Sequence, residues 1–309
     1  MSKQSKKKEA KAQNDQKDNN KSLRYGPMPT FPRQRIFTRG IIVISTLIIV
    51  YFTSSNDKTT IFASQKESLA QRVHTIDCSD SYKTEISSYP DCVPEKCGRA
   101  VTDKLITGKE TDVLLQLAKS AFALGSSDGG ASILDLHSGA LSYGKQFVNI
   151  YSLDNAKNVF SPQDFAIYKI VKSKIHHAIA HNFGVDINKI FLTHPTFFSK
   201  MTNAEAKTIH DEYWHEHVDK ETYPSFHYTS LLYLTDYGND FKGGKFIFTA
   251  PNNATVEPRR GRVIMFTSGA ENPHFVERVT SGTRYALTVS FTCDQNEAIS
   301  DPNIKEKDL

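Results

Sequence analysis

The segment HDEYWHEHVD, residues 210–219, concentrates more metal-binding and acid–base side chains than any other part of the chain. It has no apolar face at helical spacing, and it lacks the His-Glu-x-x-His pattern of helical zinc sites. We therefore expect an extended segment, in which alternate side chains share a face. His217 and Asp219 then point the same way, with Tyr213 and His215 beside them. This spacing predicts two ligands on one side of a metal ion.

A metal held by His217 and Asp219 needs a third ligand from another strand. His274, in ENPHFVERV, is the one histidine after His227 and is our candidate. Two histidines and one carboxylate that leave positions open are typical of non-haem Fe(II) oxygenases. A solvated turn is the alternative for His-x-Asp, because that pattern often arises by chance. His210 and His215 are expected at the surface, because a fourth protein ligand would close a site that needs open positions.

The segment RYALTVSFTC predicts a strand with two different faces. One face is small and polar, and the other is apolar and suited to a core. The faces are Arg284, Ala286, Thr288 and Ser290, and Tyr285, Leu287, Val289 and Phe291. A guanidinium above a small polar face suits a barrel interior that binds an anion, because arginine holds a carboxylate through two parallel hydrogen bonds. A structural salt bridge is the alternative role for Arg284.

The elements around these residues predict a mainly β domain with supporting helices. Capping residues at Thr107 and Glu110, and at Ser161 and Asp164, predict two helices ending near Gly125 and Gly184. From residue 190 onward, short β-branched and aromatic runs alternate with Gly, Pro, Asn and Asp. Such a series is typical of an antiparallel sandwich or barrel.

The motifs HVD, YTSLLYLTDY, FKGGKFIF, EPRRGRVIMF, PHFVERV and GTRYALTVSF follow one another in this order between residues 195 and 293. In that order they resemble the prolyl 4-hydroxylase-like Fe(II)/2-oxoglutarate-dependent dioxygenases. The resemblance implies a double-stranded β-helix, or jelly roll. We take residues 101–295 as the domain, with its core at about 195–293. The paired glycines of FKGGKF are expected to form a tight turn without a chemical role.

The resemblance also implies the cofactors and their ligands. His217, Asp219 and His274 would bind Fe(II), and Arg284 would bind the distal carboxylate of 2-oxoglutarate. Ascorbate is the expected reductant and O2 the second co-substrate. Tyr233 matches a co-substrate tyrosine of the family, although Tyr228 is equally placed in the sequence. Many collagen-type members have lysine where this chain has Arg284, which puts collagen as a substrate in doubt.

The N-terminal part of the chain differs sharply in charge from the rest. Its first 40 residues hold seven lysines and four arginines against three acids, a net charge of +8, which leaves −4 on the remainder of a chain of net charge +4. A mildly acidic domain argues against nucleic-acid binding. The apolar run GIIVISTLIIVYF after this basic flank predicts a signal-anchor helix. We expect a disordered cytosolic tail at 1–39 and the membrane helix at 40–56.

The four cysteines follow the predicted anchor, as expected for a domain in the lumen of the endoplasmic reticulum or Golgi, or outside the cell. A stem at 57–100 and a tail at 296–309 would flank the domain. We predict the pairs Cys78–Cys92 and Cys97–Cys293, with a zinc site at Cys92 and Cys97 as the alternative. Asn253-Ala-Thr is a glycosylation signal in a polar loop.

Together these features predict a membrane-anchored lumenal dioxygenase of type II topology. It would couple oxidative decarboxylation of 2-oxoglutarate to succinate with hydroxylation of a C–H bond, in a substrate of the protein class. Two alternatives stay open at this point. One is a degenerate barrel that serves as a lumenal binding module, and the other is a zinc-binding or lectin-like β-sandwich. Arg284 has no role in the latter.

Overall fold

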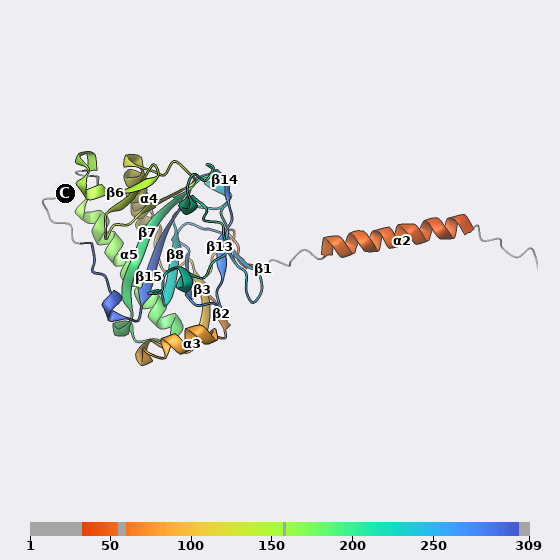
Figure 1. Ribbon diagram of the computed structural model, residues 1–309, viewed down its shortest axis with the longest axis horizontal. Helices are drawn as coiled ribbons and strands as arrows, with labels where there is room; N and C mark the ends of the chain where they lie inside the picture. Colours follow the sequence, from red (N-terminus) through yellow and green to blue (C-terminus); the bar gives the residue numbers. More distant parts are fainter. Residues whose placement is uncertain (1–32, 55–59, 157–158, 303–309) are drawn as a thin grey trace, which may run out of the picture. The chain divides into compact units, whose positions relative to one another are not determined.

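The computed structural model describes residues 33–54, 60–156 and 159–302 of the chain. The chain divides into two units, Met1–Asp57 and Lys58–Leu309 (Figure 1). In the first unit, helix α2 spans Arg33–Ser54. Of the predicted disordered tail, residues 1–32 lie outside the described part, and residues 33–39 belong to this helix.

The predicted membrane-spanning helix at 40–56 is not supported. Helix α2 covers most of that range, yet no helix in the described ranges is both long and apolar enough to cross a membrane. The reason lies in the composition of α2, whose 22 residues include three arginines and five serines and threonines. A hydrocarbon core demands about 20 predominantly apolar residues in succession.

The second unit contains two facing β-sheets and a short two-stranded sheet. The larger sheet has nine strands and the smaller has four. In spatial order the nine strands are β2 (Arg72–Ile76), β3 (Cys97–Thr102), β12 (Val263–Thr267), β8 (Tyr228–Tyr233), β15 (Arg284–Thr292), β7 (Phe191–Met201), β4 (Ala131–Leu134), β5 (Ala140–Tyr143) and β6 (Gln146–Asn149). The four are β1 (Thr60–Ala63), β11 (Ala254–Val256), β10 (Phe246–Phe248) and β13 (His274–Val276); β14 (Val279–Gly282) pairs with β9 (Phe241–Gly243).

The two faces of the large sheet bury different cores, as strand alternation requires. On β15, Leu287, Val289 and Phe291 join residues of the long helices in one apolar cluster. Ala286 instead joins the second cluster, which fills the space between the large and small sheets. The two faces predicted for RYALTVSFTC are therefore confirmed. The small polar face looks into the interior of a barrel-like sandwich.

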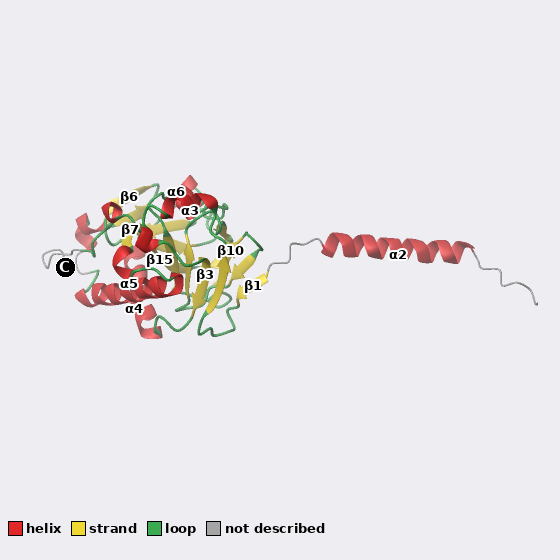
Figure 2. Cartoon of the chain, turned by 90° about the horizontal axis from the view of Figure 1, so that it is seen from below, coloured by secondary structure: helices red, strands yellow, loops and turns green. Residues whose placement is uncertain are grey.

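Two helices, α4 (Gly108–Leu124) and α5 (Pro162–Phe183), cover the outer face of the large sheet (Figure 2). Both begin with the predicted capping boxes, Thr107 with Glu110 and Ser161 with Asp164. Gly184 ends α5 in the left-handed conformation, with φ of 68°. The sequence prediction of these helices is confirmed, and the domain is mostly β-sheet with helices.

Of the segment predicted to be a separate stem, residues 57–100, the described part, residues 60–100, is instead built into the domain. It supplies β1, which pairs in parallel with β11, and β2, which pairs with β3. Every residue of β3 is buried, because β3 lies between β2 and β12. Polar and apolar residues do not alternate along CGRAVT, because a strand that is buried on both faces has no solvent-exposed side.

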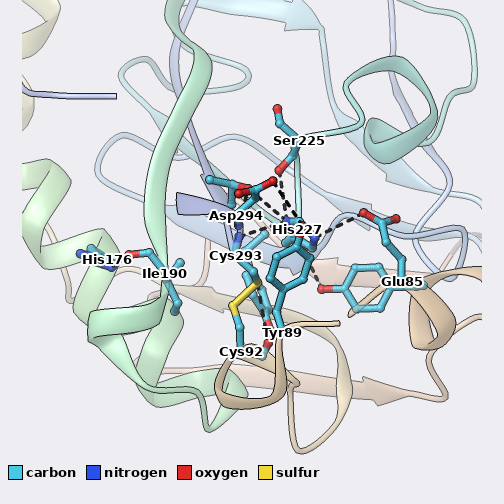
Figure 3. Close-up of a disulfide and its surroundings, with 12 residues drawn as sticks. Glu85, Tyr89, Cys92, His176, Ile190, Ser225, His227, Cys293 and Asp294 are labelled. Atoms are coloured by element: carbon cyan, nitrogen blue, oxygen red, sulfur yellow. Dashed lines mark hydrogen bonds and ion pairs between the residues drawn. A yellow bond between two sulfur atoms is a disulfide. The ribbon is translucent and has the colours of Figure 1, made fainter. Parts of the chain in front are cut away.

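The predicted disulfide pairing is wrong, and so is the zinc alternative. The bonds join Cys78 to Cys97 and Cys92 to Cys293. The register of β2 and β3 decides the first, because Ile76 lies opposite Cys97 and Cys78 follows two residues later. Figure 3 shows the second bond, which ties the 3-10 turn Pro90–Cys92 to the residue after β15.

Candidate metal centre

Three side chains from two distant segments of the chain meet inside the barrel. His217, Asp219 and His274 each offer one ligand atom, and these atoms all lie within 4.8 Å of one another. Asp219 Oδ1 is 3.6 Å from His217 Nε2 and 3.5 Å from His274 Nε2. The structure thus brings together all three residues predicted as metal ligands. Both imidazoles and the carboxylate oxygen face one point, as a shared cation requires.

Backbone pairing holds the two histidines side by side. His217 and His274 form an antiparallel bridge with two N–H···O hydrogen bonds of 3.0 Å. Asp219 follows at the first residue of the short helix α6 (Asp219–Thr222). The predicted extended conformation of residues 210–219 is confirmed only around His217, because Ile209–Asp211 form a 3-10 helix, residues 213–215 form a turn and α6 begins at Asp219 itself. This change of direction turns Asp219 toward the two imidazoles.

Hydrogen bonds fix which nitrogen of each imidazole faces the centre. His217 Nδ1 donates to the His215 carbonyl at 3.0 Å, and His274 Nδ1 donates to the Asn272 carbonyl at 2.9 Å. Because a carbonyl can only accept, Nδ1 carries the proton and Nε2 keeps its lone pair for a cation in the neutral ring. The Phe246 ring stacks on His274 with centroids 4.7 Å apart and restricts its rotation.

The pKa of Asp219 suits a cation site, while the pKa values of the two histidines shift in opposite directions. Burial opposes ionisation of Asp219, but His274, His217 and the Thr229 hydroxyl outweigh it and hold the pKa of the carboxyl below its ordinary value. Burial lowers the pKa of His274. For His217 burial acts in the same direction, but Asp219 outweighs it and raises the pKa. Asp219 is therefore an anion between two imidazoles.

The triad and Arg284 line the same cavity of about 410 Å³. The guanidinium is 1% exposed, and its Nε donates to the Gly244 carbonyl at 3.0 Å. Arg284 Nη2 and the Tyr233 hydroxyl have no hydrogen-bond partner in the described part of the chain. Burial raises the pKa of Tyr233 to about 12, so it stays a phenol and a donor. Two buried donors without partners fit a bound carboxylate.

Strand alternation places the two candidate tyrosines on opposite faces of β8. Tyr233 lies in the inter-sheet cluster with Ala286, on the same side as Arg284. Tyr228 faces the helices instead, and its hydroxyl donates to the Cys92 carbonyl at 2.7 Å. Among the spare histidines, His215 pairs with Glu212 at 2.7 Å at the cavity mouth. Asn253 lies half-buried in the loop before β11.

Sequence reasoning missed three residues that orient the site. Thr229 donates a hydrogen bond to the carboxylate of Asp219, and Ser268 is hydrogen-bonded to Thr229. Gly244 was expected to serve a turn only, but its carbonyl holds Arg284, and an added Cβ would lie 3.0 Å from Arg284 Cδ. Alternation along YTSLLY points Thr229 inward with Tyr233, which could have identified it. Ser268 and Gly244 carry no comparable signal.

Comparison with known proteins agrees with the fold and this geometry. Residues 201–292 match the family model described as the 2OG-Fe(II) oxygenase superfamily, and the chain belongs to that family. It is 54% identical over 247 residues to 2-oxoglutarate and iron-dependent oxygenase domain-containing protein 3 of Xenopus tropicalis, covering 79% of this chain and 78% of that protein. It is 48% identical over 266 residues to the Homo sapiens protein of that name, covering 85% and 83%.

A more distant relative is matched over a smaller share of its own length. Prolyl 3-hydroxylase 3 of Mus musculus is 33% identical over 218 residues, covering 63% of this chain and 29% of that protein. Membership of the family implies Fe(II), 2-oxoglutarate and O2. The residues present fit these groups, since two imidazoles and a carboxylate suit Fe(II), and two unpartnered buried donors suit a carboxylate.

Proposed function

We propose that this protein is an Fe(II)- and 2-oxoglutarate-dependent dioxygenase that hydroxylates a C–H bond. One observation carries the proposal: the Asp219 carboxylate lies between two imidazole nitrogens in the same cavity as a buried arginine with a free N–H. In the balanced reaction, 2-oxoglutarate and O2 yield succinate and CO2, and one oxygen atom enters the substrate as a hydroxyl. Bound iron supplies the oxygen chemistry.

Different residues of the chain bind the metal and orient 2-oxoglutarate. His217, Asp219 and His274 hold the metal and leave its other positions to co-substrate and oxygen. Arg284 and Tyr233 bind the distal carboxylate of 2-oxoglutarate and so fix the direction in which it lies. Phe246, Phe266 and Leu231 line the same cavity and exclude water from it.

We assign a polypeptide substrate to this site. The relative prolyl 3-hydroxylase 3 is named for hydroxylation of proline. The lining of the cavity supports a chain-like substrate, because two of its apolar side chains are open to solvent: Ile209 is 79% exposed and Tyr223 is 39% exposed. Exposed apolar groups around a cavity favour contact with a partner.

We place the enzyme in the lumen of the endoplasmic reticulum or Golgi, or outside the cell. Two disulfides support this location, since such bonds persist in oxidising compartments. Ascorbate is the reductant that would return iron to Fe(II) there. Asn253 is the proposed glycosylation site of the domain.

The test is anaerobic binding of Fe(II) and 2-oxoglutarate to the purified chain, followed by the visible charge-transfer band of the chelate. The parent should give the band, and His217→Ala and Arg284→Ala should weaken it. His215→Ala, at the cavity mouth, is the matched control and should retain it. Absence of the band from well-folded parent protein would refute the proposal and favour a binding module.

A further inference from the structure

A second buried arginine near the metal centre has no role in the scheme above. Arg99, on β3, is 1% exposed, and its Nε and Nη1 have no hydrogen-bond partner in the described ranges. Its Nη2 donates to the Ala250 carbonyl. No carboxylate within these ranges forms an ion pair with it. A buried charge in such surroundings is costly to the fold, so a stabilising role does not explain it.

Arg262 shows what a structural arginine looks like in this domain. It is fully buried, like Arg99, but Nε and Nη2 bind both oxygens of Asp103 at 2.8 and 2.9 Å. Its other donors bind the carbonyls of Glu257 and Glu67. All three nitrogens of that guanidinium have hydrogen-bond partners. The difference between Arg262 and Arg99 points to a role for Arg99 outside folding.

The surroundings of Arg99 place its charge behind the metal centre. Arg99 lies opposite Phe266 in the pairing of β3 with β12, on the inter-sheet side with Val101. Its guanidinium carbon lies 4.1 Å from the centroid of the Phe248 ring. That ring is 6.0 Å from the ring of His274. One aromatic side chain therefore separates the cation from a proposed metal ligand, in a dry interior where charges act strongly.

The charge of the proposed centre changes sign as it is loaded. Fe(II) with the Asp219 carboxylate sums to +1, and the dianion 2-oxoglutarate brings the sum to −1. A fixed cation behind His274 disfavours the first state and favours the second. We propose that Arg99 tunes the centre electrostatically, so that 2-oxoglutarate binds more tightly to the metal-loaded protein at some expense to binding of the metal alone.

This inference rests on the proposed function, and it has a cost that can be measured. Burial lowers the pKa of Arg99 to about 10, so the group is still charged at neutral pH. If the charge of Arg99 serves to bind 2-oxoglutarate, then removing that charge should leave the metal-free protein at least as stable as before. Arg99 is thus expected to lower the stability of the fold and to raise the affinity for 2-oxoglutarate.

The experiment compares Arg99→Met with Arg99→Lys and Arg262→Met in the full chain. Three quantities are measured: the Tm of the metal-free protein, the Kd for Fe(II) under anaerobic conditions, and the Kd for 2-oxoglutarate at saturating Fe(II). Arg99→Met should keep or raise Tm, bind Fe(II) at least as tightly as the parent, and bind 2-oxoglutarate on the order of tenfold more weakly, as expected for one charge at an effective dielectric constant of about 20. Arg99→Lys should retain most of the 2-oxoglutarate affinity.

Arg262→Met supplies the opposite pattern, because it leaves the Asp103 carboxylate buried and unpaired and should lower Tm. If Arg99→Met lowers Tm and weakens both ligands together, Arg99 is a structural residue and the inference is wrong. An unchanged Kd for 2-oxoglutarate would overturn it as well. Failure of the parent to bind Fe(II) and 2-oxoglutarate would instead refute the proposed function, so the two failures are distinguishable.

Discussion

Thr229 Oγ1 donates a 2.6 Å hydrogen bond to Asp219 Oδ2 and lies 2.8 Å from Ser268 Oγ. This contact gives the two carboxylate oxygens of Asp219 different partners. Oδ2 is held by the hydroxyl, while Oδ1 faces His217 and His274. Thr229 therefore directs one oxygen of Asp219 to the metal, and the position that a second oxygen would take stays open for other ligands.

Replacing Thr229 with Val should weaken iron binding without unfolding the domain. Val keeps the shape of Thr but cannot donate to Oδ2, so the carboxylate is free to rotate. Loss of such a supporting contact typically weakens metal affinity about 10–100-fold. Anaerobic Fe(II) titration measures the change. Thr193→Val, which removes a buried hydroxyl bonded to the Glu297 carbonyl, is the control and should leave iron affinity unchanged.

Replacing Tyr233 with Phe should weaken 2-oxoglutarate binding and leave the metal-free protein as stable as before. The Tyr233 hydroxyl is buried without a partner, so its removal relieves an unsatisfied group. A hydrogen bond to a charged carboxylate contributes about 1.5–3 kcal/mol, and affinity should fall by roughly tenfold or more.

Tyr228→Phe is the matched control, because it removes a hydroxyl that is bonded to the Cys92 carbonyl. It should lower the free energy of unfolding by about 1 kcal/mol and leave the Kd for 2-oxoglutarate unchanged. Thermal unfolding with and without 2-oxoglutarate, in the presence of Fe(II), separates the two variants. Equal behaviour of both would contradict the assignment of Tyr233.

Stability should fall as pH decreases below 6.5, and His227 should account for part of the loss. Burial, aided by Lys220, lowers the pKa of His227 to about 3. Glu85 lies 3.4 Å from its Nε2 but is half-exposed and shared with Lys220, so burial prevails (Figure 3). In the unfolded chain the pKa is about 6.5. Between these values only the unfolded state binds the proton, which costs about 2 kcal/mol of stability by pH 5.

His227→Asn tests whether His227 causes this loss of stability at low pH, because Asn does not take up a proton. The Asn oxygen can accept the hydrogen bond that the Cys293 N–H gives to His227 Nδ1. Urea unfolding of the metal-free protein at pH 7.5 and pH 5 gives the loss for each variant. The variant should lose less stability than the parent on acidification, and His177→Asn, an exposed substitution on α5, should lose as much as the parent. An equal loss in all three would exclude His227.

The two disulfides should differ in their contribution to stability. Cys92 and Cys293 are 201 residues apart, whereas Cys78 and Cys97 are 19 apart. In the chain-entropy description the longer loop is worth about 5 kcal/mol and the shorter about 3 kcal/mol. Replacing both cysteines of the long-range pair with Ala should therefore lower Tm more than the same change in the short-range pair. Mapping of disulfide-linked peptides verifies the pairing beforehand.

The sequence by itself determined the elements whose signals are local. Capping boxes at Thr107 and Ser161 specify where the two long helices begin, since a helix start needs only a few neighbouring groups. Alternation along RYALTVSFTC specified which face of β15 meets the helices. His217, Asp219, His274 and Arg284 were found from residue type, from spacing and from the family resemblance, and all four line one cavity.

The tertiary structure decided what depends on register and on distant contacts. Sequence spacing could not pair the cysteines, because the partner of Cys97 is set by how β2 lies against β3. It could not give Thr229, Ser268 and Gly244 their roles, because each acts on a side chain from another strand or loop. Nor could it separate Arg99 from Arg262, since both are buried cations and only the position of Asp103 in space distinguishes them.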